Sequence, residues 1–410
     1  MKETKINISI HIILKLNFNY LILHIVQINY SEMKALFLVF HGFEAHNGIS
    51  KKIFYQIDGL KQCGVDARLI YLFIDEDGYH KRMADETVIE NFGKGVLAKI
   101  KKRIYYDSLL KYILQEEIEF VYVRHDLNAN PFLVSLFKSL KKNNIKIILE
   151  IPTYPYDQEF IHADWKECFQ NKIDKLFRMS LAKTLFRIVT FTDLSVIWGV
   201  PTINISNGID FNKVRIKATD CISKDKLNMI GVADIHAWHG YDRVIKGLAN
   251  YYQQNNQVKV YFHIVGEGIK QLVNELKLIV KQNQLEEYVQ FHGPKSGLEL
   301  DVFFDFSDFG IASLARHRSN ITNIKTLKNR EYAARGIPFI YSETDTDFDN
   351  MPYIIKAPAN ETPINIQSIV DFHSKLTISA QDIRLSINHL SWKNQMNAVI
   401  NNITNTKTTL

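Results

Sequence analysis

The sequence is poor in cysteine and lacks the marks of a secreted or membrane-spanning chain. Its 410 residues include three cysteines, Cys63, Cys168 and Cys221. They are scattered and odd in number, so we expect neither a disulfide framework nor a zinc site. Polar residues interrupt the apolar stretch over residues 6–22, so it does not read as a spanning helix, and no signal-peptide cleavage site comes after it. A reducing cytoplasm is the expected environment, with the cysteines as packing residues.

The remaining composition is that of an ordinary globular chain. Hydrophobic residues make up 46% and charged residues 23%, and this length predicts two or three domains. The net charge of +6 favours a polyanionic partner or an anionic lipid surface and identifies neither. No repeat and no low-complexity linker divides the chain.

Residues 1–32 differ from the rest of the chain. Every even position from Ile8 to Tyr20 is apolar, which is a strand period. Met33 then begins a continuous apolar run, MKALFLVF. We expect the working protein to start at Met33 and residues 1–32 to be a leader outside the functional fold. The alternative is an extra edge strand or a membrane-surface segment, and an exposed edge of this kind would be prone to aggregation.

Beyond Met33, apolar strand-like runs alternate with longer stretches of helical period, which is typical of parallel α/β sheets. The strand-like runs are KALFLVF, ARLIYLF, EFVYV, IKIILE and RIVTFT in the first half, and LNMIGVA, VKVYFHIV, YVQFHG, DFGIAS and IPFIYS in the second. The turn formers of VPTINISNGIDFNKV separate the halves. We therefore predict two doubly wound domains, residues 33–205 and 206–378, and a C-terminal helix and tail over residues 379–410.

Two such sheets usually bind a ligand where their strands end, so the loops there are the candidate site. Gly42 and Gly48 belong to a loop that leads into a helix, where free amides can meet a phosphate or a sugar hydroxyl. The loop lacks the G-x-G-x-x-G spacing, which disfavours a nicotinamide cofactor. His125 ends another strand. The alternatives are a plain tight turn for the glycines and a structural role for the histidine.

Three further loops carry polar or glycine residues after strands. Glu150 ends a strand, and Tyr154 and Tyr156 follow it in a loop that prolines stiffen, which suits sugar stacking. His239 precedes a helix in the second half. The remaining loop has Gly266 and Gly268, which would let a ligand approach the backbone closely.

The stretch ITNIKTLKNREYAARGIPFIYS poses a separate question. Residues 327–335 are good helix formers, Gly336 suits a left-handed cap, and residues 338–341 read as a buried strand. None of these rules accounts for the acidic residue Glu331.

The order NGID, WHGYDRVI, IVGEG, FHG and REYAARGIPFI resembles the retaining glycosyltransferases of GT-B fold called family 4, or group 1. The resemblance runs from Met33 to the C-terminus and is most specific in the second half. It implies two Rossmann-like domains facing a central cleft, with the C-terminal helix packing back toward the first. It also implies a cytoplasmic enzyme that uses a nucleotide-sugar without a metal or other cofactor, in polysaccharide or glycolipid synthesis. Glu331 stands where the family's acid binds the donor ribose. A salt bridge to Arg335 is the alternative.

The sequence departs from the family pattern at three positions. Asn323 replaces a second glutamate that contacts the donor sugar, and Asp234 and His239 replace an arginine and a lysine that neutralise the diphosphate. We expect the charge to come from a protonated His239 or from Arg316, Arg318 and Lys325, helped by amides at the start of the helix at Leu327. Our prediction is that the arginine segment has taken over this role.

The resemblance also assigns roles to the first domain. His125 would position the donor sugar, with Gly48 nearby, and the acceptor would enter on the side of Gly42, Glu150, Tyr154 and Tyr156. The acceptor hydroxyl would attack from the face that the diphosphate leaves, and domain closure would exclude water. Asn323 and Glu331 would complete the catalytic set.

Residues 94–112 alternate basic and apolar side chains at helical spacing. This pattern fits peripheral docking on an anionic membrane, where lipid-linked glycan acceptors reside, or an ordinary solvated helix face. Nucleic acid is not expected as a partner, because no recognition motif accompanies the charge. Two other functions stay open. The protein could be a catalytically impaired binding partner, which would show no turnover, or a sugar-nucleotide epimerase, which would convert a donor without an acceptor.

Overall fold

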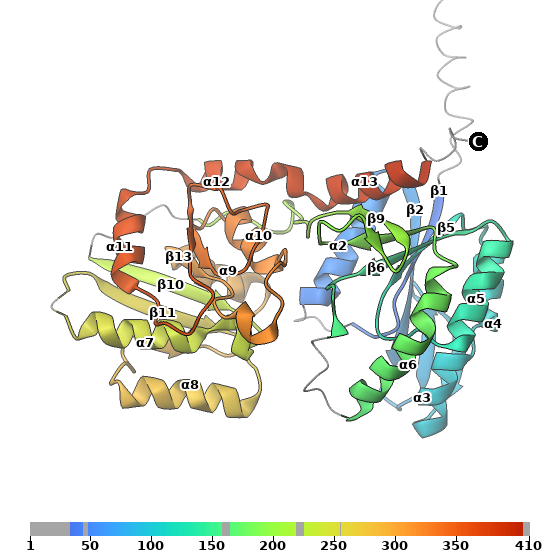
Figure 1. The fold of residues 1–410 in the computed structure, drawn as a ribbon, viewed down its shortest axis with the longest axis horizontal. Helices are drawn as coiled ribbons and strands as arrows, with labels where there is room; N and C mark the ends of the chain where they lie inside the picture. Colours follow the sequence, from blue (N-terminus) through green and yellow to red (C-terminus); the bar gives the residue numbers. More distant parts are fainter. Residues whose placement is uncertain (1–32, 44–47, 158–164, 219–224, 255, 405–410) are drawn as a thin grey trace, which may run out of the picture.

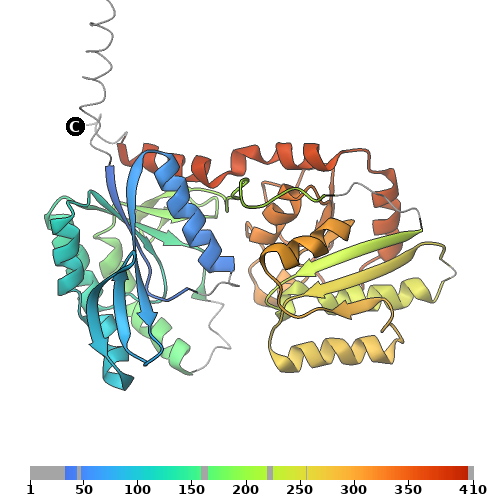
Figure 2. The ribbon, with the colours of Figure 1, turned by 180° about the vertical axis from the view of Figure 1, so that it is seen from behind.

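The computed structural model describes residues 33–43, 48–157, 165–218, 225–254 and 256–404. The predicted leader, Cys221 and the last six residues of the predicted tail lie outside this part of the chain. Figure 1 shows two α/β domains side by side, and Figure 2 shows the same arrangement from behind.

The first domain is built on a nine-stranded sheet of order β4-β3-β2-β1-β5-β6-β7-β9-β8. The parallel strands are β1 (Met33–Leu38), β2 (Val65–Ile74), β5 (Phe120–Arg124), β6 (Lys146–Ile151), β7 (Arg187–Thr190) and β9 (Val200–Asn204). The helices are α2 (Gly48–Gln62), α3 (Gly95–Ile104), α4 (Asp107–Gln115), α5 (Pro131–Lys142) and α6 (Trp165–Ala182). Every residue of β5 is buried, as expected for a strand covered by helices on both faces.

The first sheet also has antiparallel strands that the sequence did not predict. They are β3 (His80–Ala84), β4 (Thr87–Gly93) and the short β8 (Val196–Ile197). The β3 and β4 sequences are rich in polar residues and β4 lies at the sheet edge, so they lack the continuous apolar run of a central strand.

The second domain has a six-stranded parallel sheet of order β12-β11-β10-β13-β14-β15. Its strands are β10 (Lys226–Val232), β11 (Lys259–Val265), β12 (Val289–Phe291), β13 (Phe309–Ile311), β14 (Phe339–Tyr341) and β15 (Ile354–Lys356). Its helices are α7 (Tyr241–Tyr252), α8 (Lys270–Gln282), α9 (Gly297–Phe306), α10 (Leu327–Ala334) and α11 (Ile366–Lys375). The predicted helix at Leu327 and the left-handed Gly336, with φ 75°, are both present.

The C-terminal segment bridges the domains. The predicted single helix is broken into α12 (Ala380–Ser386) and α13 (Trp392–Thr404) by a 3₁₀ turn over Asn388–Leu390. Residues of α12 join the second-domain core, whereas Trp392 and Met396 of α13 join the first-domain core beside Ile53 of α2. The helix therefore packs back on the first domain as expected (Figure 1).

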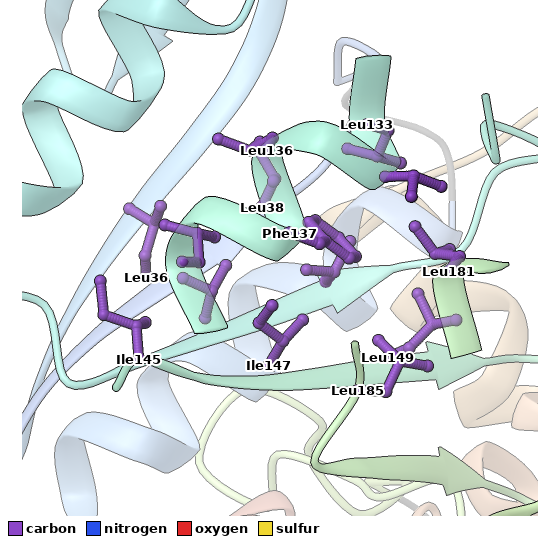
Figure 3. Packing of buried hydrophobic residues seen from close by; sticks show 14 of the residues in the cluster. Leu36, Leu38, Leu133, Leu136, Phe137, Ile145, Ile147, Leu149, Leu181 and Leu185 are labelled. Atoms are coloured by element: carbon purple, nitrogen blue, oxygen red, sulfur yellow. The ribbon is translucent and has the colours of Figure 1, made fainter. Parts of the chain in front are cut away.

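The main cluster of the first domain lies between the sheet and α5. Figure 3 shows Leu133, Leu136 and Phe137 of this helix against side chains of β1 and β6. These buried aliphatic contacts fix the ends of β5 and β6 in place, and the loops at those ends form one wall of the candidate active site.

Candidate active site

A cavity of about 530 Å³ lies between the two domains, where the strands end. The first domain lines it with residues of α2, α6 and the loops after β5 and β6, and the second domain with the loop after β13 and the start of α10. The lining residues are Ile49, Lys52, Arg124–Leu127, Pro152, Thr153, Tyr156, Glu167, Gln170, Asn207, His239, Ser313, Arg316 and Ile324–Lys328. A second cavity, of about 420 Å³, lies at the amino-terminal ends of β1, β5 and β6, and none of the predicted site residues lines it.

Three cationic side chains form the second-domain wall. Lys325 is buried and its Nζ donates to Ser206 Oγ at 3.2 Å. Arg316 lies over the ring of Trp238, with 5.3 Å from its guanidinium carbon to the ring centre. Lys328 lies in the first turn of α10, at whose start Thr326 makes no side-chain cap. The uncapped amides and the three cations together make this wall suited to an anion.

Lys328 is the residue of this wall that the sequence analysis missed. Its Nζ is buried and has no hydrogen-bond partner among the described residues. Burial, and next the Arg316 charge, hold its pKa well below the usual value. A lysine in the first turn opposes the helix dipole, so its position was an available signal for a bound anion.

Glu343, which follows β14, is a second residue that the sequence did not predict as part of the site. It is buried, with one carboxylate oxygen accepting from Thr326 and Asn329 at 3.4 Å and the other lacking a partner among the described residues. Burial raises its pKa to about 7, opposed by the charges of Arg316 and Lys328. This carboxyl group therefore titrates near neutrality directly behind the cationic wall.

His239 lines the cavity, and its burial disfavours the charged form that one expectation gave it. It is buried, and its Nδ1 accepts from the His236 backbone N–H at 3.0 Å. Burial, and next Lys328 and Arg316, hold its pKa well below the usual value, so the ring is neutral at pH 7. Asp234 points outward, with 75% of its side chain exposed, and contacts His236 at 3.3 Å.

The two arginines of the predicted segment lie in different surroundings. Arg316 lines the cavity, whereas Arg318 forms ion pairs with Asp242 at 2.9 Å and with Glu361. The segment Arg316–Ser319 is a 3₁₀ helix, in which residues two positions apart point in different directions. Arg318 thus braces the turn against α7 in this structure, and its predicted role toward the donor diphosphate stays a prediction.

His125 of the first-domain wall is held by a buried network. Its Nε2 lies 3.2 Å from Asp174 Oδ1, while Tyr156 donates to Asp174 Oδ2 at 2.6 Å and the Ala129 backbone N–H donates to Oδ1 at 3.2 Å. Burial alone would raise the pKa of Asp174, but the hydrogen bond from His125 leads the interactions that hold it below the usual value. His125 and Tyr156 line the cavity as predicted, and Asp174, which orients them, was missed.

Glu150 lies beneath the cavity and does not line it. Its fully buried carboxylate accepts from Lys52 at 3.1 Å, Arg124 at 2.7 Å and Tyr122 at 2.6 Å. Burial works to raise the pKa of Glu150, but Lys52 and Arg124 lower it to about 2. The predicted acceptor-side residue is therefore the counter-ion of two cations that do line the cavity.

Several predicted residues lie outside the cavity lining. Tyr154 packs edge-on against Trp198, with ring centres 6.5 Å apart. Four predicted glycines also lie outside the lining. A Cβ at Gly266 would lie 1.7 Å from Ala233 O, and one at Gly268 would lie 2.3 Å from Ile235 O, so packing between loops already requires glycine at both positions. Gly42 packs near Leu72 O, and Gly48 begins α2 next to the lining residue Ile49.

The two residues at the centre of the family resemblance are not among the lining residues of the cavity. Asn323 is exposed and precedes the lining residue Ile324. Glu331 lies one turn into α10, where Arg335 donates to its Oε1 at 3.1 and 3.2 Å. The alternative ion pair thus exists in this structure, and the roles of Asn323 and Glu331 toward a donor stay predictions.

Two general properties bear on the chemistry of the site. Within the described ranges, no three His, Cys, Asp or Glu side chains come together as a metal site. In the same part of the chain, no helix combines the length and apolar character needed to cross a membrane.

No family model and no curated protein matches the sequence. Solved structures match the fold. A glycosyltransferase from Rickettsia africae has a TM-score of 0.61 at 13% identity, covering 93% of this chain and all of its own. Sucrose-phosphate synthase from Thermosynechococcus elongatus has a TM-score of 0.64 at 12% identity, covering 91% of this chain and 98% of its own. Anabaena HepE in complex with UDP and glucose has a TM-score of 0.59 at 13% identity, covering 91% of this chain and all of its own. The chain therefore has the GT-B fold, as the sequence analysis expected.

Proposed function

We propose that the protein is a cytoplasmic, metal-independent glycosyltransferase that moves a sugar from a nucleotide-sugar donor to a glycan or lipid-linked glycan, with retention, in polysaccharide or glycolipid synthesis. The observation that carries the proposal is Lys328, whose buried amine has no partner among the described residues and lies in a cavity beside two other cations. A diphosphate would supply the missing partner. The similar fold of HepE, solved with UDP and glucose, supports this choice of ligand.

In this proposal the second domain holds the leaving group. Arg316, Lys325 and Lys328 surround the diphosphate, and the uncapped amides of α10 donate to its oxygens. These charges stabilise the diphosphate as the anomeric bond lengthens toward an oxocarbenium ion. Glu331 would accept from the ribose hydroxyls, and Asn323 would contact the donor sugar.

The first domain holds the donor sugar and admits the acceptor. Asp174 fixes the ring of His125 at the cavity wall, so His125 can position the sugar without losing side-chain entropy at each turnover. The acceptor hydroxyl attacks from the face that the diphosphate leaves and gives its proton to the departing phosphate. No protein nucleophile takes part in this sequence.

Asp174→Asn is expected to lower kcat by about 100-fold while changing KM for the donor little, because it loosens the ring of His125 rather than removing a binding group. Steady-state kinetics with a radiolabelled nucleotide-sugar measure both constants. Asp157→Asn is the matched control, since Asp157 pairs with Arg178 near Tyr156 but does not contact His125. Full activity in a folded Asp174→Asn protein would show that the orientation of His125 does not matter for catalysis.

Binding of UDP is expected to take up protons at neutral pH. The pKa of Lys328 is depressed and that of Glu343 is about 7, and a bound diphosphate raises both because it favours the ammonium and disfavours the carboxylate. Affinity should therefore fall as pH rises. Calorimetric titration in two buffers of different ionisation enthalpy measures the uptake, and identical binding enthalpies in both would contradict it.

Turnover distinguishes the proposed enzyme from a second candidate, a nucleotide-binding partner without activity. The outward position of Asp234, where the resembled family has a cation, favours that candidate. The test incubates the full chain with UDP-, GDP- and ADP-sugars, with and without membrane extract, and follows the label. Transfer supports the enzyme, donor conversion without acceptor indicates an epimerase, and binding without any conversion supports the partner.

A further inference from the structure

Two helices of the first domain carry an unusual outer surface. Helices α3 and α6 lie next to each other at the same end of the domain in both views (Figures 1 and 2). Arg103 joins them, since its guanidinium donates to the side-chain oxygen of Gln170 at 2.6 and 2.7 Å when that amide is turned to accept. We call the exposed apolar residues of these helices the α3–α6 face. Its members are Val96, Leu97, Ile100, Trp165, Phe169, Leu176 and Met179.

Helix α6 is amphipathic, but its apolar stripe faces solvent instead of the core of its own domain. Trp165, Phe169, Leu176 and Met179 follow a spacing of four, seven and three residues, which puts them on one stripe of the helix. Each is at least 51% exposed, and Trp165 is 74% exposed. The buried side of the helix carries the polar network of Asp174, and Leu181 and Ala182 near its C-terminal end join the first-domain core. An outward-facing apolar stripe of this kind marks a surface that binds something outside its own domain.

Helix α3 shows the same property with a stronger charge. Ala98 is its one buried residue, and Val96 and Leu97 are 72% and 69% exposed. The helix and its N-cap carry five basic residues and no acidic one: Lys94, Lys99, Lys101, Lys102 and Arg103. Within residues 94–112, the part that the sequence analysis expected at a membrane, α4 behaves differently, because Leu109 is fully buried.

We propose that the α3–α6 face docks on a bilayer that contains anionic phospholipid. Exposed apolar side chains beside many lysines fit the boundary between head groups and acyl chains, where lysines snorkel toward phosphates and tryptophan is favoured. Protein interfaces are depleted in lysine, which makes a protein partner the poorer fit. Lys166, Lys172 and Lys175 of α6 add to the basic charge around the face.

Docking through the α3–α6 face would place the membrane near the cavity. Glu167 and Gln170 of α6 line the cavity, while Trp165 and Phe169 of the same helix face outward. A bilayer on the α3–α6 face would therefore lie beside the first-domain wall of the cavity. The inference stands on exposure and charge alone, so it does not depend on the proposed catalytic activity.

Vesicle sedimentation of the full chain tests the proposal. We expect binding to phosphatidylcholine vesicles with about one-third phosphatidylglycerol, and at least about tenfold weaker binding to phosphatidylcholine alone, since each basic residue near an anionic surface adds to affinity. Leu97→Asp/Phe169→Asp should reduce binding at least about tenfold, and Lys99→Glu/Lys101→Glu should remove the preference for the anionic lipid.

The matched control is Leu298→Asp/Val302→Asp, which changes two exposed apolar residues on α9 of the second domain and should leave vesicle binding unchanged. Thermal melting shows whether each variant is folded. The proposal is overturned if folded wild-type protein does not bind anionic vesicles, or if the α3–α6 variants bind like the control. It is also overturned if sedimentation velocity shows a dimer that the α3–α6 variants dissociate, because the face would then join two copies of the chain.

Discussion

Lys328→Met is expected to weaken nucleotide binding by roughly 10- to 150-fold and to raise the free energy of unfolding by about 1–3 kcal/mol. Both effects have one cause. The Lys328 amine is buried without a partner among the described residues, which costs stability, and it gains a charged partner when the diphosphate binds. Methionine keeps the length and packing of the side chain without the polar group. Urea unfolding and calorimetric titration with UDP measure the two changes on the same samples.

Lys325→Met is the control for this prediction. Lys325 also lines the cavity, but its ammonium already donates to Ser206 and lies 3.8 Å from Asp347. Its replacement should weaken nucleotide binding without any gain in stability. A Lys328→Met protein that is less stable than wild type would show that the buried amine has a structural role. One that binds nucleotide as wild type does would show that the amine does not contact the diphosphate.

Glu150→Gln is expected to lower the free energy of unfolding by about 3–5 kcal/mol, because it leaves two buried cations without a counter-charge. Lys52 and Arg124 both depend on this carboxylate. Chemical unfolding at pH 7 measures the loss. Asp66→Asn is the control, since its partner Arg68 is on the surface and such pairs contribute about 0–1 kcal/mol.

The pH dependence of the free energy of unfolding gives a second test of Glu150. The pKa of Glu150 is about 2 in the folded protein, below the ordinary glutamate value of about 4.3. A carboxylate with a depressed pKa contributes stability that is present above the unfolded pKa and is lost as pH falls toward 2. Glu150→Gln should therefore lose less stability than the wild type does as the pH falls toward 2. A Glu150→Gln protein with wild-type stability at pH 7 would contradict the buried-pair account.

The central strands and most of the fold could be predicted, because buried parallel strands leave continuous apolar runs in the sequence. Each of the ten predicted runs is a strand in the structure. The hairpin of β3 and β4 could not be read in this way, because an edge strand with one exposed face keeps polar residues. The break between α12 and α13 was also missed, since Leu390 and Trp392 continue the apolar pattern although they face different domains.

The location of the candidate site could be predicted from the ends of the strands, but the contacts within it could not. His125 was found because it ends a strand, and His239 because it lies in the loop before a helix. Arg316 was found because the family resemblance calls for a cation, and all three residues line one cavity. The roles of Asp174 and Glu343 depend on burial and on partners far away in the sequence, which spacing does not show. The difference between Arg316 and Arg318 depends on a 3₁₀ turn of four residues, below what residue patterns resolve.

Thermal melting of the full chain with UDP, GDP, ADP and CMP tests the central claim most directly. A ligand that binds only the folded protein raises Tm once its concentration exceeds Kd. A rise in Tm is expected with one of these nucleotides, and at equal nucleotide concentration the rise should be smaller in Lys328→Met and in Glu331→Ala. Folded protein whose Tm does not change with any of the four, at concentrations up to the millimolar range, would contradict the assignment of this cavity to a nucleotide-sugar.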